Sequence, residues 1–220
     1  MRETLETRSG SRWYDFLGAY AAIAWFALSI FESARALAAA KDDTAGLLLK
    51  TFYCSNILLL LLMIAFLAVR REAVLRPGGP WPGLAGAVGL VAPLLIALVP
   101  VAPPTPARAF TSAALMLLGA LGGIWAMLYL RRAFSILPQA RLLVTAGPFR
   151  YVRHPLYLSE FVAVAGVMLN HAQPWATLVY LIAMLAQLPR IFYEEAILQE
   201  AFPEYREYAM KTAKFVPFIY

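Results

Sequence analysis

Two short segments of the sequence hold the residue types that could carry out chemistry. Residues 147–160 include Arg153, His154 and Tyr157, and residues 190–195 end in two adjacent glutamates. Such side chains can bind a charged ligand, orient a nucleophile or move a proton. Arginines and tyrosines are also common at the ends of membrane-spanning helices, where they serve only as anchors. The elements that position these segments must therefore decide between the two interpretations.

The second segment is the harder of the two to interpret as a plain surface. Arg190 and Glu194 are four residues apart, so a helix would place them in an ion pair. They directly follow an apolar stretch, and inward-facing charges at the edge of a membrane are candidates for function. The alternative is an exposed ion pair with little energetic weight.

The composition indicates a polytopic membrane protein. Hydrophobic residues make up 61% of the 220 residues and charged residues 15%, unlike an ordinary soluble domain. The net charge of +6 does not indicate nucleic acid, because the cations lie at the ends of apolar runs. Cys54 is the single cysteine and lies in an apolar run, so we expect no disulfide framework and no metal site.

The apolar runs predict an all-α fold with four transmembrane helices, a helical hairpin and an amphipathic tail helix. We expect the spans at about 16–38, 47–69, 83–101 with a kink at Pro93, and 110–130. The first is too long, and too charged at Glu32 and Arg35, for a cleaved signal peptide. A basic segment, 131–154, precedes the hairpin of 156–169 and 175–188, and the tail follows from Arg190. Residues 1–130 would form the membrane region and 131–220 the catalytic region of one membrane domain.

The hairpin should return the two polar segments to the same membrane face, where they could form one pocket with a tunnel into lipid. Placing both chain ends in the cytosol puts 15 of the 19 lysines and arginines on the cytosolic side, as the positive-inside rule favours. Gly119 and Gly123 have a small-xxx-small spacing that permits close helix packing, although chance explains it equally well in this composition.

The run from Gly147 to Tyr157 resembles the R-H-P-x-Y motif of the isoprenylcysteine carboxyl methyltransferase and phospholipid methyltransferase superfamily. The tail is similar to that family's closing pattern, R-I-x-x-E-E-x-x-L-x-x-x-F-x-x-Y-x-x-Y, beginning at Arg190. Together the two pieces cover about residues 141–220. The sequence departs from the pattern at Ser159 and Pro203, where glycine is common, and at Lys214, where arginine is frequent.

The resemblance implies an integral membrane enzyme that binds S-adenosylmethionine and methylates a lipophilic acceptor such as a prenylcysteine-like carboxylate or another lipid. Arg190 would orient the acceptor or neutralise a carboxylate, and Glu194 is the nearest candidate base if the acceptor needs one; these are the implied catalytic residues. The implied cofactor-binding residues are Val144, Gly147, Tyr151, Arg153, His154, Pro155, Tyr157, Leu158, Ser159, Glu194 and Glu195.

Two other interpretations stay open. A sterol-reductase-like enzyme that uses NADPH shares the R-H-P-x-Y motif, often with an acid close behind it, as Glu160 is here. A non-enzymatic scaffold or transporter is disfavoured because ionisable residues are scarce in the first four spans. The high content of alanine and arginine and the lack of N-x-Ser/Thr sequons suit a bacterial inner membrane. We expect neither a nucleic-acid partner nor a metal.

Overall fold

The computed structural model describes residues 12–76, 78–102, 105–171 and 173–216. Over these ranges the chain is helical, with three isolated β-bridges and no extended strand, so the predicted all-α class is confirmed. The α-helices are α2 (Arg12–Ala39), α3 (Thr44–Ala68), α4 (Trp81–Val91), α5 (Pro106–Leu130), α6 (Pro155–Met168), α7 (Trp175–Ala201) and α8 (Tyr205–Lys211). Short 3-10 helices occupy η1 (Ala92–Leu98), η2 (Arg131–Ala133) and η3 (Gly147–Arg150).

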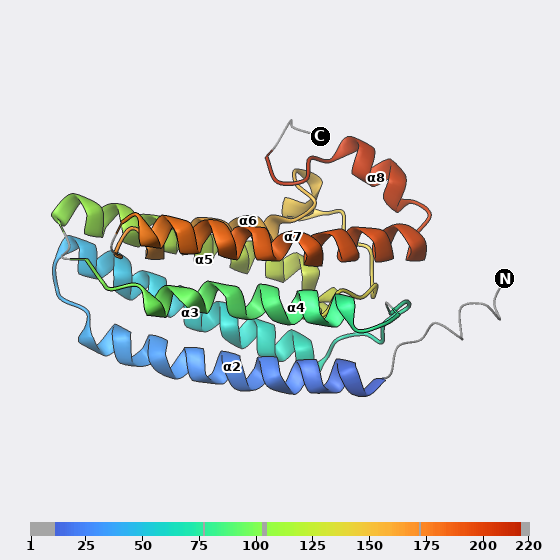
Figure 1. Cartoon of the computed structure of the whole chain (residues 1–220), viewed down its shortest axis with the longest axis horizontal. Coiled ribbons are helices and arrows are strands. Elements are labelled where there is room, and N and C mark those ends of the chain that lie inside the picture. The colour runs from blue at the N-terminus through green and yellow to red at the C-terminus, as the bar shows by residue number, and fades with distance from the viewer. Residues whose placement is uncertain (1–11, 77, 103–104, 172, 217–220) are drawn as a thin grey trace.

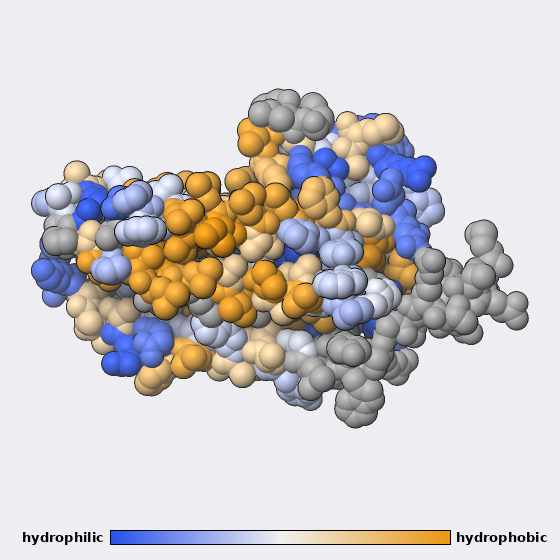
Figure 2. Space-filling model, in the orientation of Figure 1, coloured by the Kyte–Doolittle hydropathy of each residue, from blue (hydrophilic) through white to orange (hydrophobic). Residues whose placement is uncertain are grey.

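Four helices in the described ranges are long and apolar enough to cross a membrane. They are Gly18–Ala39, Thr44–Ala68, Pro106–Ala133 and Trp175–Ala201. They lie side by side along the long axis of the molecule, while α8 lies at one end (Figure 1). Hydrophobic residues cover the middle of the visible face, and hydrophilic residues gather around α8 and at the opposite end (Figure 2). This distribution fits a bundle embedded in a bilayer.

The first, second and fourth predicted spans are confirmed, and the predicted third span over 83–101 corresponds to the continuous helical stretch of α4 and η1, which changes helix type at the predicted kink. The α-helix there ends at Val91, and a 3-10 turn follows over Ala92–Leu98. Pro93 lacks a backbone N–H, so it cannot continue the hydrogen-bond ladder of an α-helix. Another long apolar helix, whose full length the sequence did not predict, is α7, which continues through Pro189 to Ala201. The predicted break at residue 188 is therefore wrong.

Close packing of α5 against α6 fixes the position of the first polar segment. A Cβ atom on Gly119 would lie 2.6 Å from the backbone N of Ala163 and 2.6 Å from the carbonyl O of Ser159. Only glycine permits this approach. Ser159, where the resembling family commonly has glycine, lies within an ordinary helix, and its Oγ occupies the space beside Gly122 on α5.

Candidate functional site

A tight turn presents the first polar segment at one end of the bundle. Gly147 has a φ of +63°, and a Cβ there would meet the ring of Tyr129 at 2.6 Å. Glycine is favoured at such a backbone conformation and contact. The turn leads into η3, where the carbonyl of Phe149 accepts a hydrogen bond of 2.7 Å from the hydroxyl of Tyr208 on α8. This hydrogen bond ties α8 to η3 and so fixes the position of the first polar segment.

A second tie joins the R-H-P motif to the residues that follow α8. Val152 forms a parallel β-bridge with Ala213. The backbone N–H of Arg153 donates to the carbonyl of Ala213 at 2.8 Å, and that of His154 donates to the carbonyl of Lys214 at 3.3 Å. We call residues 212–216 the clamp segment. It places the side chain of Lys214 beside the motif.

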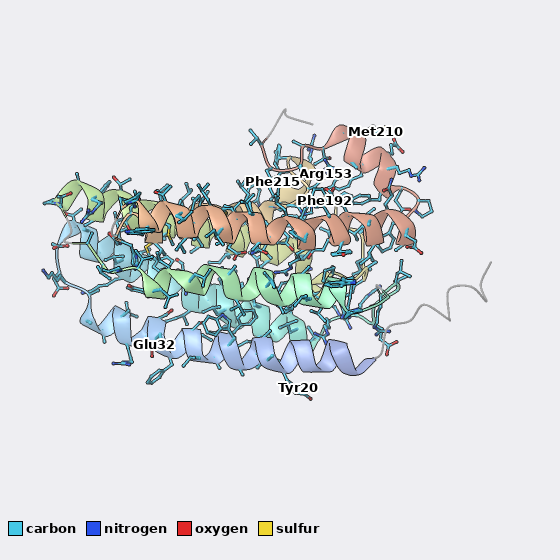
Figure 3. The ribbon with its side chains drawn as sticks, in the orientation of Figure 1. Tyr20, Glu32, Arg153, Phe192, Met210 and Phe215 are labelled. Atoms are coloured by element: carbon cyan, nitrogen blue, oxygen red, sulfur yellow. The ribbon has the colours of Figure 1, made fainter. Side chains whose placement is uncertain are left out.

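Glu195 is the centre of an outer charge cluster. Its carboxylate lies 3.3 Å from Arg153, 3.0 Å from His154 Nε2 and 2.8 Å from Lys214. Figure 3 shows Arg153 at the end of the bundle that carries α8, in the same region as Phe192 and Phe215. The ring of Phe215 contacts that of His154, with centroids 5.7 Å apart. The cluster joins three elements that are far apart in the sequence.

Glu194 and Glu160 belong to an inner cluster with Arg190. The hydroxyl of Tyr157 donates to Glu194 at 2.6 Å, and Arg190 Nε lies 3.4 Å from the same carboxylate oxygen. The guanidinium lies over the ring of Tyr157, 5.2 Å from its centroid, a cation–π geometry. The fully buried Gln187 donates to Glu160 at 3.1 Å. The predicted i,i+4 pair of Arg190 with Glu194 is confirmed, and it is mostly buried rather than a surface pair.

One cavity of about 380 Å³ connects the inner cluster to the apolar interior of the bundle. Its polar end is lined by residues that include His154, Tyr157, Glu160, Arg190 and Glu194. Its apolar end is formed by side chains of α2, α3 and α5, among them Trp25, Phe26, Phe52, Leu59 and Met63. A ligand with one charged and one apolar part fits such a cavity.

The structure brings most of the predicted site residues together. Those that line the cavity are Val144, Arg153, His154, Pro155, Tyr157, Ser159, Arg190 and Glu194. Glu195 lies behind them in the outer cluster, and Gly147 shapes the turn. Two residues lie elsewhere: Tyr151 is 56% exposed, and neither it nor Leu158 lines the cavity. The N–H of Leu158 is also already bonded to the carbonyl of His154.

Sequence reasoning missed several residues that complete the site. Glu160 was weighed only for a reductase, and Gln187 lies within an apolar run that predicts plain membrane helix. Tyr205 and Tyr208 line the cavity from α8, and burial raises the pKa of both hydroxyls, so both stay protonated at neutral pH. Tyr205 and Tyr208 are part of the closing pattern that begins at Arg190, but the pattern alone did not indicate that they line a cavity.

Part of the chain is similar to a family of methyltransferases. The family model described as phospholipid methyltransferase matches residues 107–205, which include α5, the R-H-P motif and α7. The predicted resemblance to this superfamily is thereby confirmed, and the match supports a membrane methyltransferase.

Two bacterial relatives match over a similar length. A cobalt-zinc-cadmium resistance protein of Cupriavidus metallidurans is 32% identical over 46% of this chain and 44% of its own length. A nickel-cobalt-cadmium resistance protein of Alcaligenes xylosoxydans is 32% identical over 48% of this chain and 51% of its own. The chain thus spans about half the length of the curated relatives it matches.

Proposed function

We propose that this protein transfers the methyl group of S-adenosylmethionine to a lipophilic acceptor. The observation that carries the proposal is the cavity itself, with the family's motif residues at its polar end and membrane-helix side chains at its apolar end. A water-soluble cofactor can reach the polar end, and a lipid-like acceptor can occupy the apolar end. Both would meet near Tyr157 and Arg190.

The side chains of the cavity fit the chemistry of this cofactor. S-adenosylmethionine carries a sulfonium and an ammonium group, and two carboxylates, Glu160 and Glu194, face the cavity. Two arginines face it as well, but Arg153 is already paired with Glu195, which leaves Arg190 to balance the two carboxylates. Opposite charges at short range attract strongly where water is excluded. His154, Tyr157, Tyr205 and Tyr208 add polar and aromatic groups. We assign the cofactor to this polar end, with the outer cluster around Glu195 fixing the motif behind it.

When bound, the cofactor supplies an electrophilic methyl carbon, and the protein contributes alignment and the exclusion of water. The hydroxyl of Tyr157 and the guanidinium of Arg190 both contact Glu194, so each holds the others in place. Arg190 would orient the acceptor from this fixed position. A carboxylate or thiolate acceptor is already nucleophilic, whereas an amine or phenol would release its proton to Glu194.

The acceptor enters from the bilayer in this proposal, because the apolar end of the cavity is built from α2, α3 and α5. We further propose a bacterial inner membrane, with the polar end in the cytosol, where S-adenosylmethionine is made. The names of the two relatives concern metal resistance and specify no reaction. Among the residues that the structure describes, no group of three or more His, Cys, Asp or Glu side chains is placed to hold a metal.

Calorimetric titration of the detergent-purified protein with S-adenosylhomocysteine, and with NADPH in parallel, tests the class of cofactor. Saturable binding of S-adenosylhomocysteine without NADPH binding is expected. Binding of NADPH alone would identify a reductase-like enzyme and refute the proposal.

Transfer of radiolabelled methyl groups into a total lipid extract then tests the catalytic assignment. Glu194→Gln and Arg190→Ala are expected to abolish turnover. Because each breaks a mostly buried ion pair, the thermal unfolding midpoint should fall by several degrees, and activity is therefore measured at a temperature at which circular dichroism shows the variant to be folded. Glu204→Gln and Arg206→Ala, at exposed positions beside α7, are the matched controls and should retain turnover. Normal methylation by both site variants would show that these residues are not catalytic.

A charge-matched ligand pair tests whether the cavity recognises the sulfonium. Sinefungin has an ammonium group where S-adenosylhomocysteine has a neutral sulfur, so the two carboxylates should favour sinefungin. Glu160→Gln removes one of these charges and should reduce that preference by about tenfold, the effect of about 1.4 kcal/mol. An unchanged preference for sinefungin over S-adenosylhomocysteine would show that Glu160 does not interact with the charged centre of the cofactor.

A further inference from the structure

A second hollow lies at the same end of the bundle, between the last turns of α3 and α5. Its floor is apolar and its rim is basic. The lining residues are Phe66, Val69, Tyr129, Leu130, Leu142 and Val144, with Arg71, Arg131 and Arg132 around them. We call this hollow the arginine groove. Three of its residues, Leu130, Leu142 and Val144, also line the main cavity, so the two share a wall.

Hydrogen bonds between two loops hold the rim in place. The backbone N–H of Arg71 donates to the carbonyl of Arg132 at 3.0 Å, and Arg132 Nε donates to the carbonyl of Val69 at 2.9 Å. The guanidinium of the buried Arg141 donates to the carbonyl of Arg71. The loop after α3 is therefore fixed against the loop after α5, and the rim is organised before any ligand arrives.

The backbone at Arg131 adds a strained residue to this rim. Its φ is +46°, a conformation that is unfavourable for a residue with a Cβ atom. Such outliers persist where the surrounding structure requires them, and they gather at binding sites.

The arginines of the groove lack the carboxylate partners that the other site cations have. Arg153, Arg190 and Lys214 each contact a glutamate. Within the described ranges of the chain, no carboxylate forms an ion pair with Arg71, Arg131 or Arg132, all of which are exposed. Three neighbouring cations without counter-charges favour an anion between them.

We infer that the arginine groove binds the phosphate of an anionic phospholipid. α3 and α5 are both long enough to cross a membrane, so a groove at their ends lies at the level of lipid headgroups. The arginines would contact the phosphate, and the floor around Phe66 and Val69 would contact the first part of the acyl chains. Because the groove and the main cavity share a wall, this lipid would lie next to the candidate active site. It would be a bound lipid and not the methyl acceptor.

Native mass spectrometry of the detergent-purified protein titrated with phosphatidylglycerol, phosphatidylcholine or inorganic phosphate tests the inference. A saturable one-to-one adduct with phosphatidylglycerol is expected, with much weaker binding of the other two. The double variant Arg71→Gln, Arg131→Gln should bind phosphatidylglycerol about thirtyfold more weakly, the combined effect of two arginines near a lipid phosphate. The control double variant Arg206→Gln, Lys211→Gln removes the same charge from α8 and should bind like the wild type.

Three results would overturn the inference. They are equal binding of phosphatidylglycerol and phosphatidylcholine by the wild type, unchanged affinity in the arginine double variant, and phosphate binding as tight as lipid binding. The first and third comparisons use the wild-type protein, so they hold even if the double variant fails to fold. None of these results depends on methyl transfer.

Discussion

Glu195→Gln is the substitution whose effect can be worked out most fully. It keeps the shape of the side chain but removes the anion that Arg153, His154 and Lys214 share. The side chains of Arg153 and His154 are 13% and 5% exposed, so each contact contributes about 1–1.5 kcal/mol. Lys214 is 33% exposed, and solvent screening limits its contribution to well under about 1 kcal/mol. The expected loss of unfolding free energy is about 3 kcal/mol.

For a chain of this size, that loss lowers the thermal unfolding midpoint by about 6–12 °C. Scanning fluorimetry in detergent measures the shift, and calorimetric titration of the variant with S-adenosylhomocysteine shows whether the loosened motif also loses the cofactor. Glu207→Gln is the matched control, because its partner Lys211 is exposed on α8 and the midpoint should barely move. An unchanged midpoint in Glu195→Gln, or equal shifts in both variants, would refute the claim that Glu195 ties the clamp segment to the motif.

Two further substitutions test the packing around the site. Gly119→Ala should push α6 away from α5, because the added methyl group would meet Ala163 N and Ser159 O at 2.6 Å, and a midpoint lowered by several degrees is expected; Gly83→Ala on α4, where nothing lies within 4 Å, is the control. Tyr208→Phe should cost about 1 kcal/mol by removing the bond to Phe149, measured by thermal unfolding as a function of pH. Because the pKa of the Tyr208 hydroxyl is raised in the folded state, the difference from the wild type should stay constant below about pH 10, the ordinary tyrosine value, and shrink above it.

Local patterns predicted the parts of this structure that depend on neighbouring residues. Runs of apolar residues located α2, α3 and α5, and a spacing of four residues predicted the pair of Arg190 with Glu194. The extent of α7 was harder to predict, because charged residues after position 189 indicated a boundary. The helix continues because its backbone groups bond to one another within the helix and need no partner from solvent. Arg190 can follow the apolar part because it contacts Tyr157 and Glu194 inside the bundle.

The tertiary contacts of the site had no sequence signal of this kind. No periodicity indicates that Ala213 pairs with Val152, or that Lys214 reaches Glu195. The role of Glu160 likewise depends on Gln187, which lies 27 positions away on another helix. A motif supplied the residue types, and only the packing of α6 against α5 and α7 determined which of them face the cavity.

The clamp segment also has a consequence for how this protein is made. Its residues 213 and 214 pair with the motif at 152–154, so the motif emerges from the ribosome about 60 positions ahead of its partner. α2, α3 and α5 can enter the membrane while the polar end of the cavity still lacks its outer side. Synthesis must therefore pass residue 214 before the site is complete, and a nascent chain halted earlier would be inserted in the membrane with an incomplete site.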